Sequence, residues 1–266
     1  MCFGEATTPN EYYCPSKMNA LLSTTYFGPI QWYQKLYRAD EVWIEQHESF
    51  QKQTYRNRCV IATTQGTQVL TVPVRSEERR VKSEEFPSGV PVDSTEGMAA
   101  ANSSKATGRR DNGNLFTLHS SLINNVRISD HGNWRHLHWN ALKSAYGDSP
   151  FFMYYEDDLR PFFERRWDYL FDFNEAIREK ICELLDIHPN VHYTNAYLPS
   201  HVGEGTGAGL VMSDFRNTIN PKHPAPDPDF EPRRYYQVYE AKHGFQPNLS
   251  IVDLLFNMGP ESIFYL

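Results

Sequence analysis

The sequence has no long hydrophobic run, few cysteines and no surplus of positive charge, and each absence excludes a class of protein. No stretch approaches the roughly 18 apolar residues of a membrane-spanning helix, so no membrane insertion is expected. The 4 cysteines form no Cys-x-x-Cys pair and match no zinc-motif spacing. We therefore expect neither a disulfide framework nor a metal site. Cys59 and Cys182 lie in apolar patterns and are expected to be buried.

Positive charge is scarce as well. The chain carries 26 lysines and arginines against 33 acidic residues, a formal net charge of -7. Proteins that bind nucleic acid non-specifically usually carry a basic surplus, so no nucleic-acid partner is expected. Residues 1–17 lack the charged-then-apolar pattern of a secretory signal. We therefore expect a cytoplasmic protein in which 1–17 form a disordered extension, and the oligomeric state is left open.

Common nucleotide-binding and nucleophile motifs are also missing. The sequence contains no P-loop and no Gly-x-Ser-x-Gly motif. Glycines alternate over 203–209, but this spacing differs from the Rossmann fingerprint, and Glu204 would repel a phosphate. The glycines are therefore predicted to form a mobile loop, and no cofactor is expected.

Aromatic residues are abundant but unevenly distributed. The chain has 16 Phe, 16 Tyr and 5 Trp, whereas 76–114 is rich in charge and 199–233 is rich in proline and glycine. Segments of that composition bury too little apolar surface to offset the entropy lost on ordering them. We therefore predict a single domain over 18–266, with flexible loops inserted at 76–114 and 199–233.

The first ordered segment predicts a β-α-β unit. Residues 20–30 have the pattern of a buried strand that runs into a Gly-Pro turn, 31–39 have helical periodicity, and 42–44 form a second apolar strand. Strand, helix and strand in this order favour a parallel pair. The segments 58–63 and 68–74 flank a Thr-Gln-Gly-Thr turn and predict a hairpin. The expected fold class is therefore α/β with a mixed sheet.

Helical periodicity dominates the second half of the chain. Asn133 is placed to cap a helix over 134–147, and Ser250 to open another over 250–258. The most continuous apolar stripe predicts one long helix near 158–187 that packs against the sheet. The residues of this stripe are Phe163, Trp167, Leu170, Ile177, Ile181 and Leu184.

The densest polar stretch follows the second predicted strand. In parallel α/β sheets, ligands bind at the carboxyl ends of the strands. Three cations interleaved with amides, a hydroxyl and an aromatic ring suit a phosphate or a carboxylate. The alternative is a solvated loop or an edge strand. The residues predicted to bind a ligand in this stretch are Gln51, Lys52, Tyr55, Arg56, Asn57 and Arg58.

Histidines gather at 131, 136 and 138. On a helix, His136 and His138 face in opposite directions, so they cannot share a metal ion. His138 shares a helix face with Trp134 and therefore points inward or into a cleft. Two interpretations stay open for His138: a hydrogen-bonded, partly buried side chain, or a general base.

Several segments together resemble the WbqC-like family. They are TYFGPIQWYQKLYRADEVWIE, FQKQTYRNRCVIA, LTVPV, NWRHLHWNALKSAYGDSPFFMYY and KHGFQPNLSIVDLLFNMGPES. The resemblance implies an association with surface-polysaccharide (O-antigen) genes and a transferase activity, with glycine and an amino sugar as the proposed reactants. It assigns no catalytic residue. Many relatives carry paired aspartates after the second strand, where this chain has Glu45-Gln46-His47.

From the residues and the resemblance we predict an acyl- or aminoacyltransferase whose small-molecule substrate is a nucleotide-linked amino sugar. The three cations of the polar stretch would hold the diphosphate. Trp134 would stack on the base or the sugar. Tyr26, in the turn after the first strand, would also bind the substrate. His138 or Glu45 would take the proton of the attacking amine. Two alternatives are a binding protein that recognises a phosphorylated metabolite without turning it over, and a nucleotidyltransferase-like enzyme.

Overall fold

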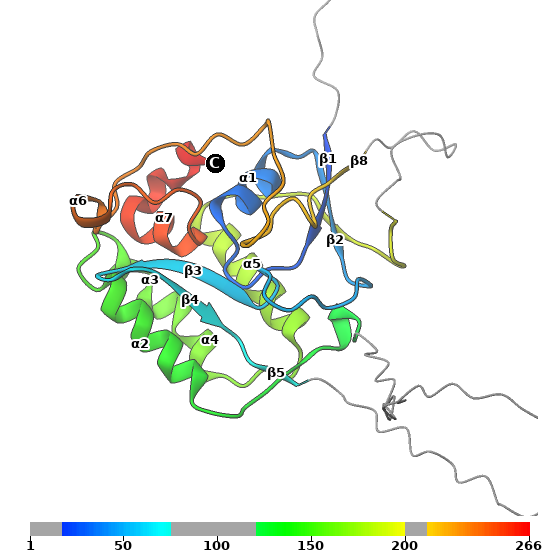
Figure 1. Ribbon diagram of the computed structural model, residues 1–266, viewed down its shortest axis with the longest axis horizontal. Helices are drawn as coiled ribbons and strands as arrows, with labels where there is room; N and C mark the ends of the chain where they lie inside the picture. Colours follow the sequence, from blue (N-terminus) through cyan, green and yellow to red (C-terminus); the bar gives the residue numbers. More distant parts are fainter. Residues whose placement is uncertain (1–17, 76–120, 200–211) are drawn as a thin grey trace, which may run out of the picture. The chain divides into compact units, whose positions relative to one another are not determined.

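The computed structural model describes residues 18–75, 121–199 and 212–266 (Figure 1). The predictions for 1–17, for 76–114 and for the glycines at 203–209 fall outside these residues. Among the helices of the described part, none is both long enough and apolar enough to cross a membrane.

Four parallel strands form the central sheet, in the order β7-β2-β1-β8. β1 (Asn19–Ser23) lies between β2 (Glu41–Glu45) and β8 (Met212–Asp214), and β7 (Val191–Tyr193) pairs with the far side of β2. All five residues of β1 are buried, as expected for an inner strand of a parallel sheet. α1 (Ile30–Arg38) connects β1 to β2, which confirms the predicted β-α-β unit.

The strand predicted over 20–30 is shorter in the structure and ends at Ser23. The indole Nε1 of Trp32 donates to the Ser23 carbonyl oxygen at 2.9 Å, so this carbonyl is satisfied by the following helix. The turn between strand and helix requires Gly28, because a Cβ at this position would lie 2.4 Å from Oγ1 of Thr25. The chain thus passes from β1 to α1 through a connection of residues 24–29, which packs closely on itself at Gly28.

An antiparallel hairpin accompanies the parallel sheet and confirms the mixed α/β class. β3 (Arg58–Thr63) pairs with β4 (Gly66–Thr71), and the turn residue Gly66 has a φ of 109°. The hairpin runs between α2 (Trp134–Tyr146) and α7 (Ile251–Met258), which match the two predicted shorter helices (Figure 1).

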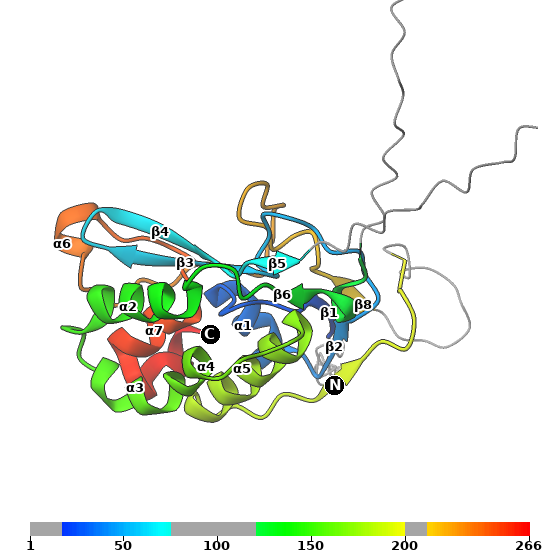
Figure 2. The ribbon, with the colours of Figure 1, turned by 90° about the horizontal axis from the view of Figure 1, so that it is seen from below.

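The helical region is divided more finely than the sequence predicted. The range near 158–187 contains the end of α3 (Phe152–Leu159), the short α4 (Pro161–Glu164) and the longer α5 (Leu170–Leu184). α2 lies between the hairpin and α4 (Figure 2). The remaining short elements are β5 (Val74–Arg75), β6 (Arg127–Ile128), α6 (Glu240–His243) and the 3-10 helices at Ile123–Asn125 and Gly259–Tyr265.

Backbone pairing explains why α4 and α5 are separate. The amide of Ile128 donates to the carbonyl of Asp168, and the amide of Leu170 donates to the carbonyl of Val126, both at 2.9 Å. These bonds hold the chain extended just before α5, where a continuous helix would need its own bonds. Part of the apolar stripe is confirmed, since Leu170, Ile177 and Ile181 of α5 are fully buried, whereas Trp167 and Leu184 are partly buried.

The predicted loop at 199–233 contributes to the fold through its second half. Residues 212–214 form β8, the edge strand beside β1. Further along, the carboxylate of Asp227 accepts hydrogen bonds from Lys35 Nζ at 2.9 Å and from Gln31 Nε2 at 2.8 Å, both on α1. This part of the chain is therefore joined to the sheet and to α1, and the described residues form one unit with one apolar core.

Candidate functional site

The carboxyl ends of three parallel strands meet at one edge of the central sheet. Their last residues are Ser23 of β1, Glu45 of β2 and Asp214 of β8. Ligands of open α/β folds bind at this edge, because the connecting segments leave the strands there with their polar groups exposed. The structure therefore places Glu45 where the sequence predicted a functional residue.

Glu45 is completely buried, and its carboxylate accepts hydrogen bonds from several neighbours. Thr194 Oγ1 donates at 2.7 Å, and the amides of His47 and Leu198 donate at 2.8 and 2.9 Å. Nη1 of Arg216 adds an ion pair at 3.1 Å. A carboxylate engaged by this many donors is suited to positioning its neighbours rather than to accepting a proton from a substrate.

Arg216 connects Glu45 to the carboxylate of β8. Its Nε donates to Oδ1 of Asp214 at 3.0 Å and its Nη2 to Oδ2 at 2.7 Å, a bidentate arrangement. Burial alone would lower the pKa of Arg216, but the hydrogen bonds and charge of Asp214, with the charge of Glu45, raise it above the ordinary arginine value. The result is a buried, rigid network of one guanidinium and two carboxylates at the sheet edge.

A cavity of about 190 Å³ opens above this network. Tyr197 is 52% exposed at the cavity, and the guanidinium of Arg216 stacks on its ring at 5.1 Å. His47 lines the cavity with a partly buried imidazole. The amides of Gln51 and Asn217 supply uncharged donors and acceptors. This combination suits one small polar group such as a sugar ring.

Two members of the polar stretch, Arg56 and Asn57, are buried and directed into the protein. Arg56 is 3% exposed and donates through Nε to Glu48 at 2.7 Å and through Nη2 to Ser23 Oγ at 2.7 Å. Asn57 is buried and donates to the carbonyl of Val72 at 2.9 Å. These contacts fix the segment after β2 to the sheet edge.

Two other members of the polar stretch, Gln51 and Lys52, are exposed. Gln51 lines the cavity, and its neighbour Lys52 is exposed. The ammonium of Lys222 contacts the side chain of Gln53, so a second exposed lysine joins this loop. Neither Lys52 nor Arg58 lines either of the two cavities described in this part of the chain.

Tyr55 and Arg58 occupy intermediate positions. Burial, with a smaller effect of Cys59, raises the pKa of Tyr55 to about 12, so its phenol is uncharged at neutral pH. Arg58 is the first residue of β3 and is partly buried. Its Nε is a buried donor that has no hydrogen-bond partner among the described residues.

Tyr26, Trp134 and His138 form a separate buried cluster. Nδ1 of His138 lies 2.9 Å from the Tyr26 hydroxyl, and His138 is only 6% exposed. Trp134 meets the His138 ring edge to face at 5.2 Å. Burial lowers the pKa of His138 to about 4, although a backbone hydrogen bond to Thr71 acts in the opposite direction. The geometry agrees with the interpretation of His138 as a hydrogen-bonded core histidine.

Sequence reasoning missed His47, Tyr197, Asp214, Arg216 and Asn217 as site residues. The last three lie in the segment predicted to be a loop, Tyr197 lies just before it, and His47 follows the second predicted strand. The available signal was the Asp-Phe-Arg sequence of 214–216, which follows an apolar run at 210–212 and Ser213. Asp and Arg two positions apart at a strand end can form the observed bidentate pair. Among the described residues, no group of three histidine, cysteine or acidic side chains could hold a metal ion together.

Comparison with known proteins identifies the family. A model of the WbqC-like protein family matches residues 24–88 and 116–207, more than half of the chain. Glu45, His47 and Tyr197 lie inside the matched residues, whereas Asp214 and Arg216 lie after them. No curated protein and no solved structure matches the chain. The chain therefore belongs to the WbqC-like protein family.

Proposed function

We propose that the protein is a cytoplasmic transferase that acylates or aminoacylates the amine of a nucleotide-linked amino sugar for a surface polysaccharide. The observation that carries the proposal is the cavity at the carboxyl edge of the sheet, where His47 and Tyr197 flank the fixed network of Glu45, Arg216 and Asp214. The chain belongs to the WbqC-like protein family, and the transferase class is what the resemblance to this family implies.

His47 takes the role of general base in this proposal. It lines the cavity, and its backbone is fixed by the 2.8 Å hydrogen bond to Glu45. A neutral imidazole nitrogen can accept the amine proton as the new N–C bond forms and the bond to the donor's leaving group breaks. His138 is less suited, because it is buried against Tyr26.

The other contacts follow from the side chains around the cavity. The exposed ring of Tyr197 offers a flat surface for the apolar face of a sugar. Gln51 and Asn217 would bond its hydroxyls. Lys52 and Lys222, both exposed on the adjoining loops, would neutralise the diphosphate as point charges.

Calorimetric titration with UDP-glucosamine, a nucleotide-linked sugar with a free amine, tests the proposal. Tyr197→Ala should weaken binding by about tenfold, because the stacking surface is lost, whereas Tyr197→Phe should keep it. Tyr154→Ala is the matched control, since Tyr154 is 69% exposed on α3 and does not line the cavity. If neither UDP-glucosamine nor any other nucleotide-linked amino sugar binds the wild type, the proposal is wrong.

A binding protein without turnover is the second candidate. It is favoured by the pairing of each carboxylate at the site with an arginine: Glu48 with Arg56, and Glu45 and Asp214 with Arg216. The replacement His47→Gln separates the two functions. For a transferase, it should leave sugar binding nearly unchanged and remove the acylated product seen by mass spectrometry. For a binding protein, neither the wild type nor the variant forms the product.

A further inference from the structure

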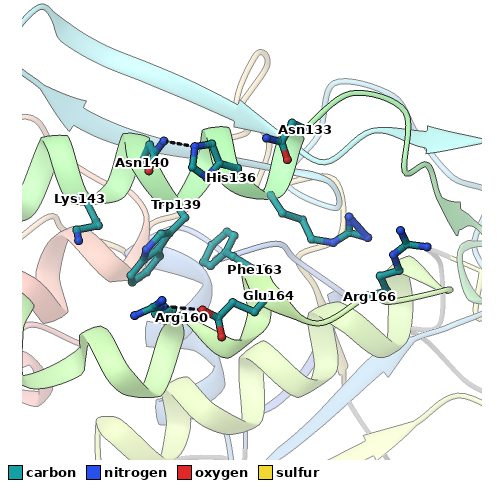
Figure 3. A pocket seen from close by; sticks show the side chains of 10 residues that line it. Asn133, His136, Trp139, Asn140, Lys143, Arg160, Phe163, Glu164 and Arg166 are labelled. Carbon is teal, nitrogen blue, oxygen red and sulfur yellow. Dashed lines mark hydrogen bonds and ion pairs between the residues drawn. The ribbon is translucent and has the colours of Figure 1, made fainter.

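A second cavity, of about 450 Å³, lies between α2 and α4 and is separate in its lining residues from the sheet-edge cavity (Figure 3). Its volume falls within the range of about 300–1,000 Å³ that is typical of small-molecule sites. We propose that this cavity binds an anionic sugar, meaning a sugar ring that carries a phosphate or a carboxylate.

Positive charge is concentrated in the lining. It contains four cations, Arg135, Lys143, Arg160 and Arg166, and one carboxylate, that of Glu164. This local excess is opposite in sign to the net charge of -7 of the whole chain. Lys143 and Arg166 lie toward opposite ends of the cavity and Arg160 on the α4 side, so cations surround the space from several directions (Figure 3).

Their present partners can be exchanged for a ligand. Arg160 pairs with Glu164 at 2.6 Å, but both side chains are more than half exposed. Lys143 lies 3.3 Å from Glu156, and Arg166 lies 3.8 Å from Asp130. Solvent-exposed pairs of this kind contribute little to stability, so an incoming anion can replace them at small cost.

Arg135 is the least exposed of the four cations. Its guanidinium pairs with Asp130 and stacks on Trp134 at 5.1 Å, which fixes the side chain. Its Nε is buried, so this donor is not open to a ligand in the cavity. Arg135 therefore contributes its positive charge to the lining.

An aromatic surface accounts for the sugar part of the ligand. The partly buried indole of Trp139 lies between Lys143 and Arg160 (Figure 3). Phe163 supports it from the core at a ring distance of 5.5 Å. A sugar can lay its apolar face on such a ring, while the side chains of Asn140 and His136, which bond each other at 2.8 Å, line the same cavity and can reach hydroxyls.

Calorimetry with the full chain tests the proposal with defined probes. Glucose 1-phosphate and glucuronic acid each carry a sugar ring and an anion, whereas glucose and inorganic phosphate each carry only one of the two. We expect at least one anionic sugar to bind about tenfold more tightly than glucose and than inorganic phosphate. The binding should weaken as salt concentration rises, because the cations are exposed.

Four replacements locate the binding. Arg160→Ala and Arg166→Ala should each weaken it by about fivefold or more, because each removes a charge-assisted bond. Arg165→Ala should change it by less than about twofold, since Arg165 adjoins Arg166 but stacks on Trp167 outside the cavity lining. Tyr197→Ala, which tests the sheet-edge cavity, should leave the binding unchanged.

Four results would each overturn the proposal. Neither anionic sugar binds the wild type; inorganic phosphate binds as tightly as the anionic sugars; or Arg165→Ala weakens binding as much as Arg160→Ala. Loss of binding in Tyr197→Ala alone would instead assign the probe to the sheet-edge cavity and would likewise overturn the proposal.

Discussion

At the scale of single residues, Arg216 shows how side chains that are distant in the sequence build the candidate site. It lies 171 positions from Glu45, and its guanidinium joins the carboxylate of β2 to that of β8. Glu45 was predictable, because a polar residue at the end of a buried strand points to the ligand edge of a parallel sheet. The positions of Arg216 and Tyr197 beside Glu45 could not be predicted, because they depend on where β8 and the chain after β7 lie in the fold.

His138 leads to a prediction about stability and pH. Burial lowers its folded-state pKa to about 4 from the ordinary 6.5. As the pH falls below about 6.5, the unfolded chain gains a proton at this residue, whereas the folded protein gains it only near pH 4. The protein should therefore be most stable above pH 6.5 and lose stability as the pH falls toward 4.

Urea unfolding at pH 7.5 and pH 5 measures this effect. The wild type should lose roughly 2 kcal/mol more over this interval than His138→Gln. The variant is expected to be less stable at both values, so the difference between the two pH values is the readout. His188→Gln is the control, because His188 is 85% exposed, and it should keep the wild-type dependence. A wild-type pH dependence in His138→Gln would contradict the assignment of a depressed pKa.

At the scale of elements, local patterns predicted α1, α2, α7 and the hairpin close to their observed bounds. The division of the range 158–187 could not be predicted, because it depends on backbone bonds from Val126 and Ile128, about forty positions earlier. β8 could not be predicted either. Three residues are too few to show an alternating pattern, and β8 lies in a segment whose composition is typical of a loop.

The connection between β1 and α1 gives a prediction at this scale. Gly28→Ala should lower the free energy of unfolding by about 1–3 kcal/mol, because the new Cβ would overlap Oγ1 of Thr25. Thr25→Ala should cost little, since this hydroxyl is buried without a hydrogen-bond partner among the described residues. The double variant should regain at least half of the loss in a urea unfolding cycle. If the two effects simply add, overlap between a Cβ at position 28 and Oγ1 of Thr25 is not the cause of the loss.

At the scale of the whole molecule, the net charge conceals how the charges are distributed. A net charge of -7 coexists with a cavity between α2 and α4 whose lining is strongly cationic. The sheet-edge cavity, in contrast, is lined by paired charges and neutral amides. The two cavities thus differ in the ligands they favour, and a sum over the sequence cannot distinguish them, because neighbours in space decide which charges remain available.

The central claim is that the sheet-edge cavity holds the amino sugar. A crystal structure of the protein with UDP-glucosamine tests it most directly. We expect density for the sugar ring against Tyr197, with its amine within hydrogen-bond distance of His47 and the diphosphate near Lys52 and Lys222. Density for the sugar in any other place, with this cavity filled by water, would show that the proposed site is wrong.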